Sequence, residues 1–91
     1  MGEALVAAVI QRFGRLDILV SNAGVTSGGH TWELPEAHWD SVVDGDLKGP
    51  FLCSKHAARH MIDRDGPGRL ITICSTSCLV GIPGQVHYQS A

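Results

Sequence analysis

The stretch that decides the fold lies at residues 16–24 and reads Leu-Asp-Ile-Leu-Val-Ser-Asn-Ala-Gly. Its first five residues form a short, mostly branched run that is too brief for a helix and too apolar for an exposed loop. The run ends at the polar residues Ser21 and Asn22, and Gly24 then lets the backbone pass close to a ligand. We therefore predict a buried strand over 16–20 with polar residues at its carboxyl end.

A helix is predicted before this strand and a loop after it. Apolar side chains recur on one helical face over residues 3–13, and Gly14 follows where a left-handed C-terminal cap would sit. Residues 25–34 carry adjacent glycines and small hydroxyl residues without periodicity, which indicates a loop.

Two helices are predicted to cross over from this loop to the next strand. Pro35 suits the first turn of a short helix that ends near Asp44. Gly45 is expected to interrupt the helical path, and Asp46 to cap a second helix that ends near Arg64.

A second strand completes the pattern. A turn signal at 65–68, Asp-Gly-Pro-Gly, precedes a branched run at 69–74. A strand, a helical crossover and another strand make a parallel pair with a right-handed connection, so the predicted class is an α/β fold with a partial parallel sheet. Because only two strands are present, we expect some apolar strand residues to lack neighbours. These are Ile18, Val20, Ile71 and Ile73.

Composition and charge narrow the classes of protein and of partner. The 91 residues are 44% hydrophobic and 18% charged, which is typical of a globular chain that buries a core. A net charge of −2 without a basic run argues against a nucleic-acid partner. The apolar stretch at 4–10 is far shorter than the roughly 20 residues of a membrane span, so no membrane partner is expected.

The cysteines indicate the compartment. There are three of them, Cys53, Cys74 and Cys78, and no pair has the CxxC spacing. This pattern predicts neither a disulfide framework nor a zinc ribbon, and we expect a cytoplasmic location.

Two hydroxyl side chains near the predicted sheet edge are candidates for chemistry. Ser75 follows the second strand, and Tyr88 follows Ser75 later in the chain. Open α/β sheets bind ligands at the carboxyl ends of their strands. A tyrosine phenol can pass a proton to a carbonyl oxygen while a serine hydroxyl donates a hydrogen bond to it. From spacing alone, the alternative that both residues only pack in a loop stays open.

Three segments together resemble the short-chain dehydrogenase/reductase family, and they cover nearly all of the chain. They read RFGRLDILVSNAGV at 12–25, WDSVVDGDLKGPFLCSKHAARHM at 39–61 and GRLITICSTSCLVGIPGQVHYQSA at 68–91. The family motif Asn-Asn-Ala-Gly appears here as Ser-Asn-Ala-Gly, and the helix start Asn-Leu-x-Gly as Asp-Leu-Lys-Gly. The resemblance implies a partial Rossmann-like sheet.

The resemblance also implies a reaction. The family uses NAD(H) or NADP(H) and transfers hydride between the nicotinamide and a carbonyl or alcohol of a small substrate. Carried over residue by residue, Tyr88 is the catalytic acid/base and a cofactor contact, and Ser75 orients the substrate oxygen. The cofactor ribose is lined by Asn22, Ala23 and Gly24.

Asp46 departs from the family, which has an asparagine at this position. That asparagine helps to hold a water in the family's proton relay, so the resemblance places Asp46 among the catalytic residues. An aspartate caps a helix as well as an asparagine does. We therefore expect Asp46→Asn to change the pH–rate profile and leave the stability nearly unchanged.

Two elements of the family are not found within these 91 residues. One is the glycine-rich turn that binds the pyrophosphate, and the other is the catalytic lysine, which would stand one position beyond Ala91. We therefore expect residues 1–91 to be the central part of one dinucleotide-binding domain, inactive alone.

Two alternatives belong to other functional classes. One helical stripe holds Cys53, His56, His60 and Asp63. Cys53 and His60 are seven residues apart, which is about 10.5 Å along the helix axis. One metal ion could therefore bind only neighbours such as His56 and His60. We favour the interpretation that this stripe, on the predicted helix 47–63, packs against a second copy of the chain, as in the homo-oligomers of the family. The other alternative is a non-catalytic interaction module.

Overall fold

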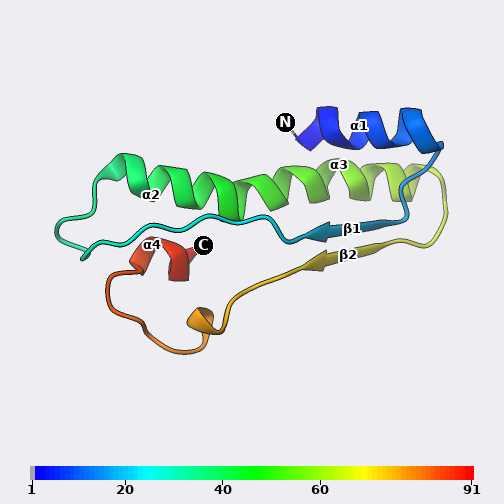
Figure 1. Ribbon diagram of the computed structural model, residues 1–91. Coiled ribbons are helices and arrows are strands. Elements are labelled where there is room, and N and C mark those ends of the chain that lie inside the picture. The colour runs from blue at the N-terminus through cyan, green and yellow to red at the C-terminus, as the bar shows by residue number, and fades with distance from the viewer. Residues whose placement is uncertain (1) are drawn as a thin grey trace. The chain divides into compact units, whose positions relative to one another are not determined.

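A computed structural model describes residues 2–91, drawn as a ribbon in Figure 1. The chain separates into two compact units. The first unit comprises the residues up to Ser21 together with Gly49–Ile73. The second comprises Asn22–Lys48 and Cys74–Ala91. Each unit therefore joins two stretches that are far apart in the sequence.

The first unit contains two helices and two strands. They are α1 (Gly2–Phe13), β1 (Ile18–Ser21), α3 (Gly49–Asp63) and β2 (Arg69–Thr72). Helix α3 packs against α1 and against both strands, and Figure 1 shows α3 between α1 on one side and the two strands on the other. At 15 residues, α3 is the longest described helix. Within residues 2–91, no helix combines the length and the apolar character that crossing a membrane requires.

The two strands pair in parallel. The register runs from Ile18 opposite Arg69 to Ser21 opposite Thr72, and the Ile73 N–H extends the ladder by donating to the Ser21 carbonyl at 2.9 Å. This pairing confirms the α/β class with a small parallel sheet.

The core of the first unit lies between α1 and α3. The buried residues are Val6, Ala57 and Met61, and the partly buried Ile10, Leu16 and Leu19 pack against them. Gly2 permits this close packing, because a Cβ there would lie 2.8 Å from the backbone N of Cys53 and the backbone C of Leu52. Gly14 has φ +86° and its N–H donates to Ile10 O at 2.7 Å, which confirms the predicted left-handed cap of the helix before the first strand.

The sequence predicts a buried strand over residues 16–20, and the predicted burial is wrong. Strand β1 begins at Ile18 and alternates exposed with half-buried residues, and all four residues of β2 are exposed. Each strand has a single partner within residues 2–91, so too little structure surrounds it. The expectation that apolar strand residues lack neighbours is confirmed, because Ile18 is 58% exposed and Ile73 is 54% exposed.

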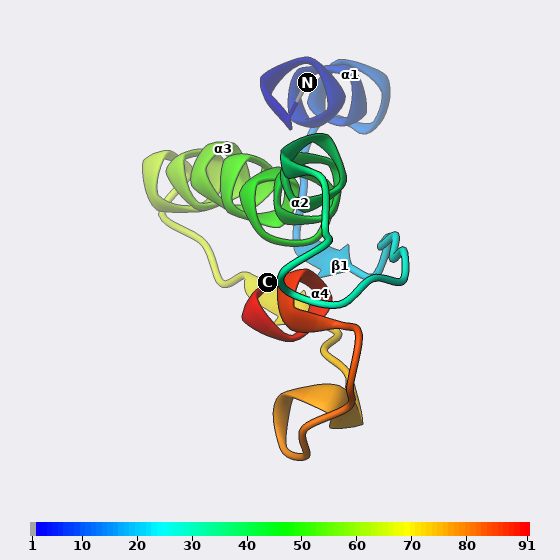
Figure 2. The same cartoon turned by 90° about the vertical axis from the view of Figure 1, so that its left-hand side faces the viewer.

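The second unit holds four short helical elements besides the loop at 22–34. These are α2 (Glu36–Val43), the π-helix η1 (Asp44–Lys48), the 3-10 helix η2 (Thr76–Cys78) and α4 (Val86–Ser90). Helix α4 packs against α2 and against η2, and Figure 2 shows α4 below α2. The second unit thereby brings residues 86–90 against residues 36–43.

Three details of the predicted crossover are wrong. Pro35 precedes the first turn as an extended N-cap residue with ψ 142°, and Gly45 does not interrupt the helical path, which passes through η1 into α3. Asp46 lies inside η1 and caps no helix. Its side chain accepts a hydrogen bond from a distant backbone group, which explains why it is not available as a cap.

Candidate functional site

Every catalytic and cofactor-binding residue predicted from the sequence lies in the second unit. The set comprises Asn22, Ala23, Gly24, Asp46, Ser75 and Tyr88. These residues come from four separate places in the chain: the exit of β1, the π-helix, the turn after β2, and α4. One compact unit therefore carries all of the residues predicted for catalysis and cofactor binding.

Asp46 and the strip Asn22–Gly24 lie together. The backbone N–H of Val25 donates to Oδ1 of Asp46 at 2.6 Å. A Cβ at Gly24 would lie 3.2 Å from the same oxygen, which is closer than ordinary contact. The small residue at 24 thus lets the Asp46 carboxylate approach the backbone of the strip. The strip itself is exposed along its length.

Ser75 is held by the turn that follows it. It is the N-cap of η2, and its Oγ accepts a hydrogen bond from the Ser77 N–H at 3.2 Å. Its hydroxyl donates to Ser77 Oγ at 3.3 Å, and Ser77 is buried. The Ser75 oxygen is therefore oriented by the backbone, while its proton is held only by a long, weak bond.

Tyr88 lies in α4 and is half-buried. Because α4 packs against η2, the elements that carry Tyr88 and Ser75 meet. No hydrogen bond joins the two side chains within the described part of the chain. That both hydroxyls reach one substrate oxygen stays a prediction.

Sequence reasoning missed a pair of residues that join the loop after Gly24 to α4. Ser27 Oγ lies 2.9 Å from His87 Nε2, and the His87 ring is fully buried. The two residues are 60 positions apart, so no local pattern links them. The one available signal was the position of His87 directly before Tyr88.

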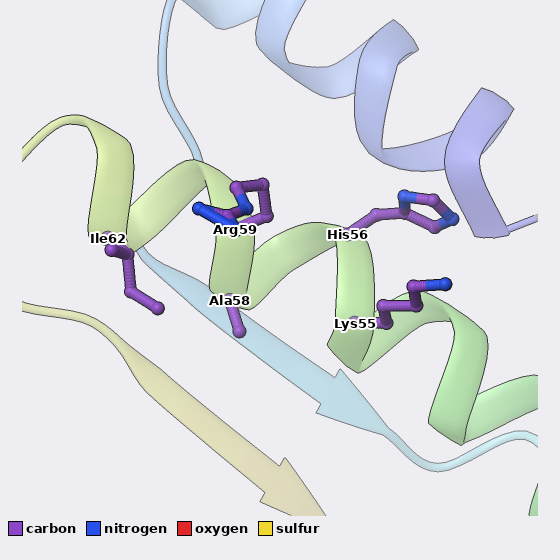
Figure 3. Close-up of a pocket in the computed structure, with 5 residues that line it drawn as sticks. All are labelled: Lys55, His56, Ala58, Arg59 and Ile62. Carbon is purple, nitrogen blue, oxygen red and sulfur yellow. The ribbon is translucent and has the colours of Figure 1, made fainter.

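The alternative of a metal-binding helix finds no support in the first unit. The Leu16 N–H donates to His60 Nε2 at 3.2 Å, which occupies one nitrogen lone pair that a metal would need. Among residues 2–91, no group of three or more histidine, cysteine or acidic side chains is arranged to hold a metal. The same helix does line a pocket, drawn in Figure 3, with Lys55, His56, Ala58, Arg59 and Ile62.

Comparison with known proteins assigns the family. The family model described as short chain dehydrogenase matches residues 1–91. The chain is 40% identical over 86 residues to the 3-oxoacyl-[acyl-carrier-protein] reductase of Staphylococcus aureus, which covers 94% of this chain and 35% of that protein. It is 37% identical over 87 residues to an oxidoreductase of Mycobacterium tuberculosis named as NAD-dependent, covering 96% of this chain and 32% of that one.

A solved structure gives the same result. The acetoin dehydrogenase of Enterobacter cloacae matches with a TM-score of 0.90 and 35% identity, over 98% of this chain and 35% of that one. The chain thus spans about a third of the length of the relatives it matches. The partial parallel sheet is the part of a Rossmann fold that these relatives share, and the chain belongs to the short-chain dehydrogenase family.

Proposed function

We propose that this chain contributes the acid/base half of an active site that transfers hydride between NAD(H) or NADP(H) and a carbonyl or alcohol of a small substrate. The observation that carries the proposal is the gathering of four separate stretches, at residues 22–24, 46, 75 and 88, into one compact unit. The names of the relatives, a 3-oxoacyl reductase and an acetoin dehydrogenase, support a carbonyl or alcohol as the reacting group.

Tyr88 and Ser75 have different roles at the substrate oxygen: Tyr88 transfers a proton, and Ser75 donates a hydrogen bond. In the reductive direction the Tyr88 phenol gives its proton to that oxygen, and in the oxidative direction it takes the proton back. The Ser75 hydroxyl donates a hydrogen bond to the same oxygen and stabilises the negative charge that develops there. Its long bond to Ser77 costs little to exchange for this partner, which supports the role.

The strip Asn22–Gly24 suits the ribose of the cofactor. Ribose hydroxyls both donate and accept, and the Asn22 amide offers both functions from an exposed position. Gly24 brings no side chain that would keep a ligand from the backbone. When bound, the nicotinamide supplies or receives the hydride. The NAD-dependent relative supports a nicotinamide dinucleotide of either type as cofactor.

Asp46 takes part in the proton relay beside the strip. Its bond to the Val25 N–H supports this role, because it keeps a carboxylate beside the residues that would hold the cofactor. A carboxylate accepts hydrogen bonds but, when ionised, donates none, whereas an asparagine does both. We therefore expect a relay that works less well here than with an asparagine.

Three broader features complete the proposal. Residues 1–91 form the central part of one dinucleotide-binding domain, in line with relatives about three times as long. The three free cysteines suit a reducing cytoplasm. Helix 47–63 contacts a second copy. Part of the stripe predicted for this contact is used within the chain, since His60 accepts a hydrogen bond from the Leu16 N–H. The contact therefore uses exposed side chains that line the pocket in Figure 3, such as Ile62, which is 69% exposed.

A graft tests the proposed function. Residues 1–91 replace the matching segment of the Staphylococcus aureus 3-oxoacyl reductase, and we refer to this protein as the graft. The graft should oxidise NADH or NADPH in the presence of a 3-oxoacyl substrate, and Ser75→Ala should lower kcat by about 100-fold. The 91 residues assayed alone should be inactive. A Ser75→Ala graft with unchanged kcat would refute the role of this serine.

A further inference from the structure

A partly buried hydrogen bond joins the loop after Gly24 to α4, and no step of the reaction uses it. Ser27 Oγ lies 2.9 Å from His87 Nε2. His87 is 0% exposed and is, with Val42, one of the two largest fully buried side chains in residues 2–91. Burying a polar ring is unfavourable unless it is hydrogen-bonded, so the Ser27 hydroxyl offsets part of that cost.

The second nitrogen of the His87 ring has no partner of its own in residues 2–91, so the ring depends on the bond to Ser27. Nδ1 of His87 is also buried, and it has no hydrogen-bond partner within the described residues. A neutral imidazole has one nitrogen that donates and one that accepts. The bond to Ser27 is therefore the one side-chain hydrogen bond that holds the ring in this part of the chain. Removing the Ser27 hydroxyl leaves both ring nitrogens without a partner.

A backbone bond ties the same two segments. The Gly29 N–H donates to the Gly84 carbonyl at 3.0 Å. Gly84 has φ +81°, a left-handed conformation that favours glycine. The loop is thus fastened at two points, one by side chains and one by backbone, to the residues that lead into Tyr88.

Tyr88 stands between two anchored neighbours. On one side is His87, and on the other Gln89, whose Nε2 donates to the carbonyls of Ile82 at 3.2 Å and Val80 at 3.4 Å. Successive side chains of an α-helix project about 100° apart. Anchoring the side chains on both sides therefore fixes the direction in which the Tyr88 phenol projects.

We propose that Ser27 and His87 are a pair of positioning residues that fix the orientation of the Tyr88 phenol relative to the strip Asn22–Gly24. This inference rests on the proposed role of Tyr88 as acid/base. Ser27 lies three residues after Gly24, so the pair links the segment that would hold the cofactor to the helix α4 that carries the acid. A displacement of about 1 Å at a reacting group can cost about 100-fold in rate, so such a link controls kcat.

The orientation of Tyr88 can be measured in the 91-residue chain itself. Tyr88 is the only tyrosine, so labelling tyrosine with carbon-13 gives a single set of ring signals in an NMR spectrum. Ser27→Ala should shift or broaden these signals, and Ser27→Thr, which keeps a hydroxyl, should restore them. Thr26→Ala is the matched control, since it removes an exposed neighbouring hydroxyl, and it should leave the signals unchanged.

Substitutions of His87 test the other residue of the pair. His87→Gln replaces the ring with an amide that can also hydrogen-bond to Ser27, so it should perturb the Tyr88 signals less than His87→Leu does. Ring signals that are the same in the parent chain, Ser27→Ala and His87→Leu would overturn the proposal.

Kinetics of the graft separate positioning from a merely structural role. Ser27→Ala should lower kcat by about 10- to 100-fold and change KM by no more than about twofold, and Ser27→Thr should recover most of the loss. If Tyr88→Phe abolishes turnover while Ser27→Ala leaves kcat intact, the positioning role is wrong and the proposed function stands. If Tyr88→Phe leaves turnover intact, the proposed function itself is wrong, and the NMR result reports the pair independently.

Discussion

The Asp46 carboxylate accepts a hydrogen bond from the Val25 backbone N–H at 2.6 Å, across 21 residues of sequence. It links the π-helix η1 to the residue that directly follows the strip Asn22–Gly24, where the family has its Asn-Ala-Gly motif. A residue expected to cap a helix instead holds a loop. The contribution of the Asp46 acceptor oxygen to stability and the effect of the Asp46 charge on the reaction can therefore be tested separately.

The acceptor role predicts a loss of stability in Asp46→Ala. Without the oxygen, the Val25 N–H loses its partner, and the free energy of unfolding should fall by about 1 kcal/mol. Asp46→Asn keeps an acceptor and should cost less. Urea unfolding measures both variants, with Asp44→Ala as the control for loss of an exposed carboxylate in the same π-helix. Equal losses in Asp44→Ala and Asp46→Ala would mean that the bond contributes nothing.

The charge of Asp46 predicts an effect on the reaction. In the graft, Asp46→Asn should raise turnover and lower the pH at which activity rises, because the amide adds a donor and removes a negative charge from the relay. The pH–rate profiles of the two versions provide the measurement. Identical profiles would show that Asp46 holds the loop and takes no part in the relay.

The close approach of α1 to α3 predicts that Gly2→Ala is destabilising. The new Cβ would lie 2.8 Å from the backbone of Leu52 and Cys53, so one helix must move, at a cost of about 1–3 kcal/mol. Gly28→Ala is the matched control, since nothing lies within 4 Å of its Cβ position. Thermal unfolding of both variants decides the matter. A Gly2→Ala chain as stable as Gly28→Ala would contradict the packing.

The contact between His60 and Leu16 predicts a stability difference between two histidines of α3. His60→Ala leaves the part-buried Leu16 N–H without its acceptor and should lower the free energy of unfolding by about 1–2 kcal/mol. His56→Ala, in the pocket of Figure 3, should cost less. Chemical unfolding of both variants compares them. Adding one equivalent of Zn²⁺ to the parent chain should leave Tm unchanged, and a zinc-dependent rise lost in both variants would restore the metal-binding alternative.

Asp17 predicts a specific acid dependence of stability. Its pKa lies below the ordinary value of 3.8, chiefly because the Arg15 side chain donates to its Oδ1 at 2.8 Å, with further help from the charge of Arg64. A lowered folded-state pKa means that the carboxylate stabilises the fold above about pH 4 and that this contribution disappears as pH falls through the folded pKa. The parent chain should therefore exceed Asp17→Asn in stability at pH 6.

The difference between the two chains should shrink as the pH falls below 3.8. Urea unfolding across pH 3–7 measures it, and Asp40→Asn on the exposed face of α2 is the control carboxylate. A difference that is independent of pH would contradict the electrostatic explanation.

Local features of the fold were predictable because their causes are local. Gly14 ends α1 in a left-handed cap, and the turn at 65–68 reverses the chain before β2, although Asp65 takes the positive φ of 52°. The parallel pair follows from two branched runs joined by a helical crossover. Each of these rests on a few neighbouring residues.

The features that were missed depend on partners distant in sequence. The hydrogen bond between the Val25 N–H and Asp46, which lies inside the π-helix, joins positions 21 residues apart, so no helical pattern reveals it. The bond between Ser27 and His87 joins positions 60 residues apart. The exposure of both strands depends on how many neighbours surround them. The candidate site could be named from the family motif, whereas the contacts that hold it could not.

The most direct test of the central claim is single-turnover hydride transfer in the graft with Tyr88→Phe. The variant keeps the ring and loses only the phenolic oxygen. We expect the rate of NADPH or NADH consumption to fall by about 1000-fold or more, while the Kd of the cofactor, measured by fluorescence titration, stays within about twofold. A Tyr88→Phe graft that transfers hydride at the parent rate would contradict the assignment of Tyr88 as the acid/base of this chain.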